Sequence, residues 1–384
     1  MPWEEATRMK RRVQFIAALD SCQYSMTELC EVYGISRKTG YKWADRWAKE
    51  GVEGLQDRSR APQGCPHSTS QTVSQQLLDL RRSHPTWGPR KLLAYLSKRE
   101  PETSWPAAST AGGILKRHGL VGNRACPRRL WPSSGRPSVQ TEAPNQVWTC
   151  DFKGQFRTGD GQLCYPLTVA DGFSRFLLGL MGLDSIAESQ AWPVFERLFR
   201  EYGLPEVIQS DNGSPFACTS APGRLSRLSV RWVKLGICLQ RIEPGHPEQN
   251  GRHERMHRTL KQETARPPAS NRAAQQECFD QFRSIYNEQR PHEALGQRTP
   301  AELYHPSCRE YPEKISGPDY PGHFEVRSVR PRGEIRWQGQ FLFLSEALCG
   351  EQVGLEETAD GVWSVYFGAL LLARFDERER KLYG

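Results

Sequence analysis

The stretch VWTCDFKG at residues 147–154 sets a carboxylate inside a short apolar run. Such a run is typical of a buried β-strand, and Asp151 has no obvious packing purpose within it. A second acid, Asp211, follows another apolar run in VIQSDNG, where we expect a strand over residues 206–209. We therefore expect both carboxylates to project from adjacent strands toward one point.

The elements expected around these two acids alternate between strands and helices. The expected strands span residues 147–152, 163–170, 176–183, 206–209 and 237–241, and the expected helices span 188–202, 225–235, 249–264 and 270–289. This order is typical of a mixed sheet with helices on its faces. We place this region at residues 145–305.

The two acids and a third carboxylate predict a divalent metal site. Carboxylate oxygens suit hard cations such as Mg²⁺ or Mn²⁺. Glu254 is our candidate third ligand, since it lies near the start of the helix expected in PGHPEQNGRHERMHRTLK. Three carboxylates can hold two metal ions about 3.5–4 Å apart, which serve phosphodiester chemistry. Asp211-Asn212-Gly213 alone is a common turn, so the prediction depends on all three acids together.

The helix that carries Glu254 also carries cations for phosphate groups. Asn250, Glu254, Arg258 and Lys261 recur at helical spacing and fall near one face. We expect this face to offer one metal ligand flanked by contacts to DNA.

The same helix contains a competing motif. His253 to His257 reads H-E-x-x-H, which on a helix can present two imidazoles to Zn²⁺ with Glu254 as general base. Glu277, further along the chain, could supply a third ligand. A zinc metalloprotease would leave Asp151 and Asp211 unused, so we favour surface positions or phosphate contacts for both histidines.

Residues 1–53 have the pattern of three short helices, which is typical of a helix-turn-helix DNA-binding domain. Ser25 and Glu28 have the spacing of a capping box, and Gly34 ends the helix that they open. A third helix follows Ser36 and stops at Gly51. The start of a recognition helix contacts bases and phosphates, so we expect DNA contacts from Ser36, Arg37, Lys38, Thr39 and Lys42. An ordinary basic helical bundle is the alternative.

The remaining regions are a second helical module, two linkers and a C-terminal β domain. Residues 73–121 are helical, and TWGPRKLLAYL places Arg90 and Lys91 in the first turn of a helix, as in a winged or simple helix-turn-helix. Residues 54–72 and 122–144 are expected to be linkers. Residues 306–384 predict short strands and a small barrel, whose acidic balance suits subunit contacts better than DNA.

Composition limits the class of protein. The chain has 384 residues, and its 11 cysteines include no CxxC pair, which argues against a zinc ribbon and for reduced thiols. Residues 1–140 carry a net charge of +11 and residues 141–384 a net charge of −3, which favours a polyanionic partner for the N-terminal part. Apolar runs are too short for a membrane span and no export signal is evident, so we expect a cytoplasmic, nucleoid-associated protein.

Residues 1 to about 305 resemble a known family. VWTCDFKG, QSDNGSPF and PGHPEQNGRHERMHRTLK, followed by YNEQRPHEALGQRTPAELY, are similar to bacterial insertion-sequence transposases with an Asp-Asp-Glu core of the retroviral-integrase superfamily. The His/Cys zinc module of retroviral integrases has no counterpart here. The resemblance implies an α/β RNase H-like catalytic core, with N-terminal all-α helix-turn-helix regions and a small C-terminal β-barrel-like domain. Lys261 matches a position that resembles a contact to the element end.

The resemblance also implies an activity. Asp151, Asp211 and Glu254 would hold two Mg²⁺ or Mn²⁺ ions, cleave double-stranded DNA at terminal inverted repeats and join the 3′-OH ends to target DNA. Two ends are joined at once, so a homo-oligomer in a synaptic complex is expected. A transposase-derived regulator that binds DNA without cutting it is the alternative, against which the presence of all three carboxylates argues.

Overall fold

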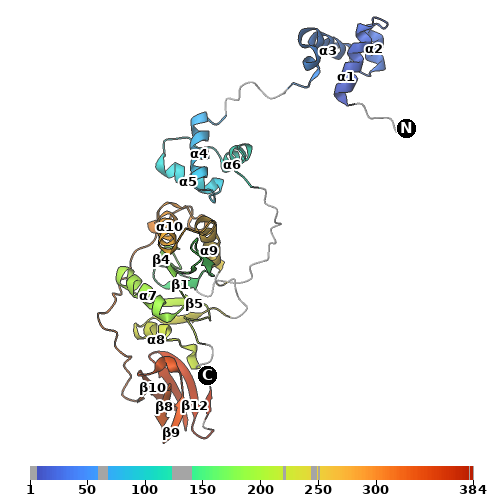
Figure 1. The fold of residues 1–384 in the computed structure, drawn as a ribbon. Coiled ribbons are helices and arrows are strands. Elements are labelled where there is room, and N and C mark those ends of the chain that lie inside the picture. The colour runs from blue at the N-terminus through green and yellow to red at the C-terminus, as the bar shows by residue number, and fades with distance from the viewer. Residues whose placement is uncertain are drawn as a thin grey trace. The chain divides into compact units, whose positions relative to one another are not determined.

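The computed structural model describes residues 7–58, 68–122, 141–218, 222–243, 249, 251–379 and 381–383. The chain divides into two compact units, residues 1–68 and 69–384 (Figure 1). Each unit is described by itself. No helix of the described residues is both long and apolar enough to cross a membrane.

The first unit contains three helices and a short 3₁₀ turn, as the sequence predicts. These are α1 (Arg8–Asp20), α2 (Met26–Val32), α3 (Arg37–Glu50) and η1 (Gly51–Leu55). The predicted capping box is confirmed, since the Ser25 hydroxyl accepts from the Glu28 backbone and the Glu28 carboxylate accepts from the Ser25 backbone. Ser36 caps α3 by accepting from the Thr39 backbone N–H.

The core of the first unit extends past residue 53, the end that we expected for this domain. Leu55 is fully buried and packs with Phe15, Leu29 and the other core side chains. The Arg12 guanidinium donates to the Leu55 carbonyl at 2.7 Å and pairs with Asp57 at 2.7 Å. An apolar side chain that completes the core therefore occupies the start of the segment assigned to the linker.

The second unit begins with a helical module of α4 (Gln71–Ser83), α5 (Pro89–Arg99) and α6 (Ala108–Arg117). α4 starts at Gln71 because the Ser70 side chain caps it, so the end of the expected linker is helical. Trp87 lies at the centre of the module, fully buried among the leucines of α4 and α5. Pro89 occupies the first turn of α5, where its missing N–H is not needed.

A six-stranded mixed sheet forms the centre of the second unit. Its strands are β1 (Val147–Phe152), β2 (Phe156–Arg157), β3 (Leu163–Asp171), β4 (Leu177–Leu183), β5 (Val207–Ser210) and β6 (Cys238–Arg241). The path runs β2-β3-β1-β5-β6, with β4 also paired to β3. β3 is antiparallel to β1 and β4, whereas β5 is parallel to β1 and β6. This is the RNase H-like arrangement that the sequence predicts.

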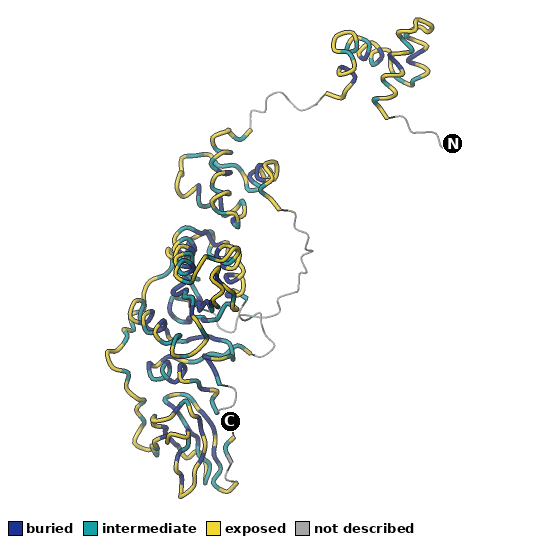
Figure 2. Tube along the Cα trace, viewed as in Figure 1, coloured by how far each residue is buried: buried dark blue, intermediate teal, exposed yellow. Residues whose placement is uncertain are grey.

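Helices cover both faces of this sheet, and β3 and β4 are buried along most of their length (Figure 2). α7 (Glu188–Tyr202) and α8 (Arg227–Lys234) pack on the face that carries Trp148. α9 (Gly251–Thr264) and α10 (Arg272–Ser284) pack on the opposite face. A π-helical turn, η4 (Ile285–Gln289), continues α10. Two short 3₁₀ turns follow, η5 (Glu293–Leu295) and η6 (Pro300–Glu302).

The C-terminal region is a small β domain whose core lies between two sheets. Five antiparallel strands follow the order β13-β12-β11-β10-β7, and β8 and β9 form a separate hairpin. Their bounds are β7 (Glu325–Ser328), β8 (Glu334–Trp337), β9 (Gln340–Phe343), β10 (Gln352–Ala359), β11 (Val362–Phe367), β12 (Leu370–Asp376) and β13 (Lys381–Tyr383). Apolar side chains of the hairpin and of the larger sheet share one cluster, which gives the expected barrel-like core.

The domain built on the six-stranded sheet continues past residue 305, where we expected it to end. Arg309 donates to the carbonyls of Pro205, Leu235 and Gly236 at 2.6 to 3.2 Å. Tyr311 and Ile315 pack against the core cluster that contains Trp148. Residues up to about 315 are therefore fastened to the core.

At Gly40, packing predicts that alanine destabilises the first unit, whereas helix propensity alone predicts the opposite. Helix propensity alone makes Gly40 unfavourable by about 1 kcal/mol relative to Ala. The structure explains the glycine, because a Cβ at this position would lie 2.7 Å from the Cys30 Sγ and 2.9 Å from the Met26 Sδ. We expect Gly40→Ala to destabilise the first unit by about 1–3 kcal/mol, measured as faster hydrogen exchange in peptides of α2 and α3.

Gly113→Ala is the matched control. Gly113 lies in α6, and nothing lies within 4 Å of the Cβ that the substitution adds. This change should slow exchange in α6, stabilising it by up to about 1 kcal/mol. Equal stabilisation by the two substitutions would contradict the packing argument for Gly40.

Candidate active site

The register between β1 and β5 aligns the two predicted aspartates. The strands are parallel, and Thr149 pairs with Gln209. Asp151 follows Thr149 by two residues on β1, and Asp211 follows Gln209 by two residues, immediately after β5. Both aspartates therefore lie at the same end of two neighbouring parallel strands.

The Asp151 side chain belongs to the face of the sheet that α9 covers. Residues two apart on a strand share a face, and the Thr149 hydroxyl lies 3.1 Å from the His253 Nδ1 on α9. The neighbouring Trp148 and Cys150 face the other side, where they join the core cluster with α7 and α8. Asp151 is consequently directed toward α9, and its Oδ2 lies 3.7 Å from the His257 Nδ1.

The loop after β5 is fixed by hydrogen bonds to neighbouring backbone. The Asn212 side-chain amide donates to the Ile242 carbonyl at 2.7 Å, and the Gly213 N–H donates to the Asp211 Oδ1 at 3.2 Å. Arg241 on β6 donates to the Ser210 hydroxyl and to the Phe216 carbonyl. Burial lowers the pKa of the Arg241 guanidinium, and the Asp211 carboxylate counteracts part of this effect.

α9 divides into a buried face and an exposed face. His253, Met256, His257, Leu260 and Thr264 are buried against the sheet and α10. Glu254, Arg258 and Lys261 are exposed. His257 lies one helical turn after Glu254 and beside Asp151, so Glu254 lies on the helix that faces the aspartate pair.

Both histidines are buried, so the predicted surface or phosphate-binding positions for them are wrong. The Thr168 hydroxyl on β3 lies 2.5 Å from the His253 Nε2 and 2.8 Å from the His257 Nε2. This hydroxyl also donates to the Asp151 carbonyl at 2.9 Å, so Thr168 connects both imidazoles of α9 to β1. Burial lowers the pKa of His253 to about 4 and that of His257 to about 2.

The structure does not assemble the alternative zinc site or a closed metal cluster. The Nε2 atoms of His253 and His257 are both committed to Thr168. Over the described ranges, no three His, Cys, Asp or Glu side chains are placed to hold a metal ion. Asp151 and Asp211 come together at adjacent strand ends, and Glu254 remains on the helix opposite them.

The predicted DNA-contact residues of the first unit lie at the start of α3. Arg37, Lys38 and Lys42 are exposed, and the Lys42 Nζ lies 4.9 Å from the centre of the Trp43 ring. Ser36 and Thr39 share the cap hydrogen bonds, with their hydroxyl oxygens 3.0 Å apart. Tyr41 is also exposed on this helix; the sequence analysis missed it, although its spacing from Lys38 was a usable signal.

The other predicted DNA contacts have different surroundings. Arg90 is exposed and pairs with Glu293 at 2.6 Å. Lys91 is half-buried, and burial together with Arg290 lowers the pKa of its ammonium group to about 8. Asn250 lies outside the described residues.

Lys153 is a cation of this site that the sequence analysis missed. It follows Asp151 by two residues at the end of β1, and it is close enough to Lys261 for the Lys261 charge to lower its pKa, after the larger effect of burial. The spacing from Asp151 would have indicated it, since residues two apart share a strand face.

Matches to family models cover most parts of the chain. Two models of an integrase core domain match residues 141–247 and 235–300. A helix-turn-helix domain matches residues 11–63, and a homeodomain-like domain matches residues 39–115. The C-terminal domain of IS481 family transposases matches residues 324–382.

The relatives found by sequence include insertion-element proteins. The chain is 25% identical over 240 residues to an uncharacterised 31.7 kDa protein of insertion element IS407 from Burkholderia multivorans, which covers 62% of this chain and 82% of that protein. It is 24% identical to an uncharacterised 39.2 kDa protein of IS476 from Xanthomonas euvesicatoria, over 62% of this chain and 66% of that protein. Together these matches support a bacterial insertion-sequence transposase in the retroviral-integrase superfamily, the family that the sequence resembles.

Solved structures similar to this chain include retroviral integrases. A chain of the simian T-cell lymphotropic virus intasome, solved in complex with a PP2A regulatory subunit, matches at a TM-score of 0.39 and 15% identity, over 80% of this chain and 98% of that one. The HTLV-2 integrase catalytic core domain, solved in complex with magnesium, matches at a TM-score of 0.33 and 14% identity, over 43% of this chain and 100% of that one.

Buried histidines predict that acid destabilises the integrase core domain. Burial lowers the pKa of His292 to about 3, as it lowers those of His253 and His257. Unfolded histidine titrates near pH 6.5, so below that pH the unfolded chain binds more protons than the folded chain. The free energy of unfolding should therefore be fully maintained above about pH 6.5 and fall on acidification, by up to about 1.4 kcal/mol per pH unit per histidine.

Urea unfolding at pH 7, 6 and 5, with ionic strength held constant, measures this effect. His292→Gln removes one of the three groups, so the dependence of its unfolding free energy on pH should be less steep than that of the wild type. An identical pH dependence in the two proteins would show that His292 is not held neutral in the fold.

Proposed function

We propose that the chain is an active DNA transposase that cleaves the ends of its own insertion element and joins the freed 3′-OH ends to target DNA. The alignment of Asp151 with Asp211 by the β1–β5 register carries the proposal. It sets two carboxylates under the helix that carries Glu254, within an integrase core domain. Packing alone gives no reason for charged groups at these positions.

The donor set fits a hard divalent cation. Asp151, Asp211 and Glu254 offer only carboxylate oxygens, which Mg²⁺ and Mn²⁺ prefer. A pair of such ions, when bound, would lower the pKa of the attacking water or 3′-OH and stabilise the leaving oxygen. The three carboxylates would hold the ions, and no covalent intermediate with the protein is needed.

Cations beside the carboxylates would position the DNA strand. Arg258 and Lys261 extend from the exposed side of α9, and Lys153 directly follows β1, two residues after Asp151. Their charges would contact phosphates on either side of the scissile bond, which fixes the strand without reading its sequence. His253 and His257 fix the helix on the sheet through Thr168 and so keep Glu254 opposite the aspartates.

Sequence recognition would belong to the helical modules. The exposed start of α3 carries Arg37, Lys38 and Lys42, as in a recognition helix that enters the major groove. α4, α5 and α6 form a second module of this kind, which would extend the contact along the terminal repeat. Joining two ends at one target requires at least two copies of the chain in one complex.

Substitution of the carboxylates tests the catalytic assignment. Asp151→Asn, Asp211→Asn and Glu254→Gln should each lower Mg²⁺-dependent cleavage of DNA that carries the element ends by at least about 100-fold, since even changes beyond the direct ligands of a metal cost about 10–100-fold. Folding and DNA affinity should be preserved, because Glu254 is exposed and both aspartates lie at strand ends.

Glu277→Gln is the matched control. Glu277 is an exposed acid on α10 and would be a ligand only in the zinc alternative, so its cleavage rate should equal that of the wild type. Cleavage that survives in all three carboxylate variants would contradict the assignment. Tight binding of the wild type to element ends without cleavage under any divalent metal would instead identify a DNA-binding regulator.

The recognition helix can be tested through the salt dependence of binding. Each phosphate contact that is lost should reduce the slope of log affinity against log salt by about 0.9. Arg37→Ala and Lys38→Ala are expected to do so on DNA that carries the element ends. Lys49→Ala, in the last turn of the same helix and paired with Asp45, should leave the slope unchanged. Equal slopes in all four proteins would remove α3 from the interface.

A further inference from the structure

The segment YNEQRPH, residues 286–292, builds a second polar site that the proposed chemistry does not use. The π-helical turn η4 brings its first residues against the sheet, and the Asn287 side chain bonds both the N–H and the carbonyl of Leu177, at 2.8 and 3.0 Å. Arg290 pairs with Glu263 at 3.1 Å and approaches the Thr86 hydroxyl. The segment is thus fixed between the sheet, α9 and the helical module.

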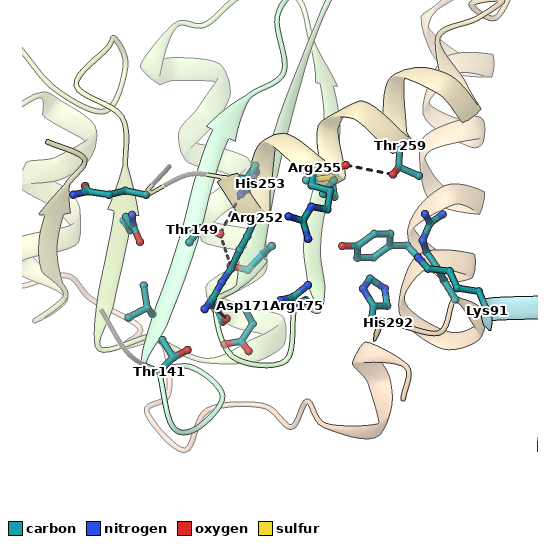
Figure 3. A pocket seen from close by; sticks show the side chains of 18 residues that line it. Lys91, Thr141, Thr149, Asp171, Arg175, Arg252, His253, Arg255, Thr259 and His292 are labelled. Carbon is teal, nitrogen blue, oxygen red and sulfur yellow. Dashed lines mark hydrogen bonds between the residues drawn. The ribbon is translucent and has the colours of Figure 1, made fainter. Parts of the chain in front are cut away.

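A cavity of about 110 Å³ lies beside this segment, lined by residues of α5, α9, the β3–β4 turn and η4 (Figure 3). A cavity of this size admits a group of a few heavy atoms and excludes a duplex. It lies beside the carboxylate site, since Thr149 and Gln209, which precede Asp151 and Asp211 by two residues, are among its lining residues. Arg252, Arg255 and Met256 face the cavity, whereas Glu254, Arg258 and Lys261 belong to the other flank.

Positive charge dominates the lining. Lys91, Arg175, Arg252, Arg255 and Arg290 contribute cations, and Asp171 is the one carboxylate among the lining residues. The Asp171 carboxylate already accepts from the Asn145 N–H and from the N–H and hydroxyl of Ser174. Among the residues that the structure describes, Arg175, Arg252 and Arg255 make no ion pair with a carboxylate.

A buried imidazole in the lining has an unused polar atom. His292 is only 7% exposed, and within the described part of the chain its Nε2 has no hydrogen-bond partner. A buried polar atom of this kind is costly unless a ligand or water satisfies it. Figure 3 shows Arg175 and Arg252 approaching the cavity from one side and His292 and Lys91 from the other.

We infer that this cavity binds a single phosphoryl group. Three guanidinium groups without carboxylate partners supply several N–H donors in planar pairs, the geometry that suits phosphate oxygens. The His292 Nε2 would complete the shell by donating to one of these oxygens when it carries the imidazole proton. Val147, Ala170 and Met256 supply an apolar wall that excludes water and strengthens these interactions.

The phosphoryl group can come from a DNA backbone or from free phosphate, and neither source depends on the proposed cleavage reaction. Lys91 belongs to the helical module and the other cations to the core, so an occupant would contact both. The inference is tested by binding without divalent metal, so its failure and the failure of the catalytic assignment are distinguishable.

The experiment compares Arg255→Gln and Arg252→Gln with the wild type and with Arg197→Gln. Arg255 and Arg252 are exposed enough for the variants to fold, and Arg197 is an exposed arginine of α7 away from the cavity. Calorimetric titration with inorganic phosphate, at ionic strength matched with chloride, measures the free ligand. Titration with duplex DNA at several salt concentrations measures the backbone.

Free phosphate as the ligand predicts phosphate binding by the wild type and by Arg197→Gln, with about tenfold or greater weakening in the two cavity variants. A DNA backbone as the ligand predicts instead a salt slope on DNA that falls by about 0.9 in the cavity variants only. The inference is overturned if the wild type binds no phosphate and all three variants give the same DNA affinity and slope.

Discussion

The parallel hydrogen bonding of β1 to β5 is the constraint on which the rest of the integrase core domain depends. The pairing of Thr149 with Gln209 determines that Asp151 and Asp211 reach the sheet edge together. A shift of one residue would turn one carboxylate into the apolar layer under α7 and α8. Trp148 and Cys150 stabilise this register, because a shift would move their side chains out of the apolar layer in which they are buried.

A second constraint is that α9, which carries many charged side chains, must pack on the sheet. α9 does this with few apolar side chains, since Met256 and Leu260 contact α10 and β4 while two imidazoles contact β3. Thr168 satisfies both imidazoles with one oxygen, so polar atoms take the place of apolar packing at the centre of the contact. Such a contact is specific, because a helix rotated about its axis would leave three buried polar groups without partners.

The sequence predicted those features that short-range chemistry decides. Capping at Ser25 and Ser36, the Pro89 start of α5 and the alternation in β1 are local, and the corresponding elements appear where they were expected. Contacts between residues that are far apart in the sequence were harder to predict. Nothing in the sequence near Leu55 shows that Arg12 binds its carbonyl, and H-E-x-x-H gives no sign that Thr168 lies beneath it. The cavity beside His292 is lined by segments that are far apart in the sequence and could not be predicted.

The π-helical turn at the end of α10 changes the direction in which the side chains of the following segment point. It accommodates one residue more than an α-helical turn would, and each residue of an α-helix turns the chain by about 100°. Asn287 therefore faces Leu177 while Arg290 and His292 reach the cavity. A regular α-helix in place of this turn would point the same side chains in other directions, away from Leu177 and the cavity. Deletion of one residue here should therefore disturb the structure more than many substitutions would.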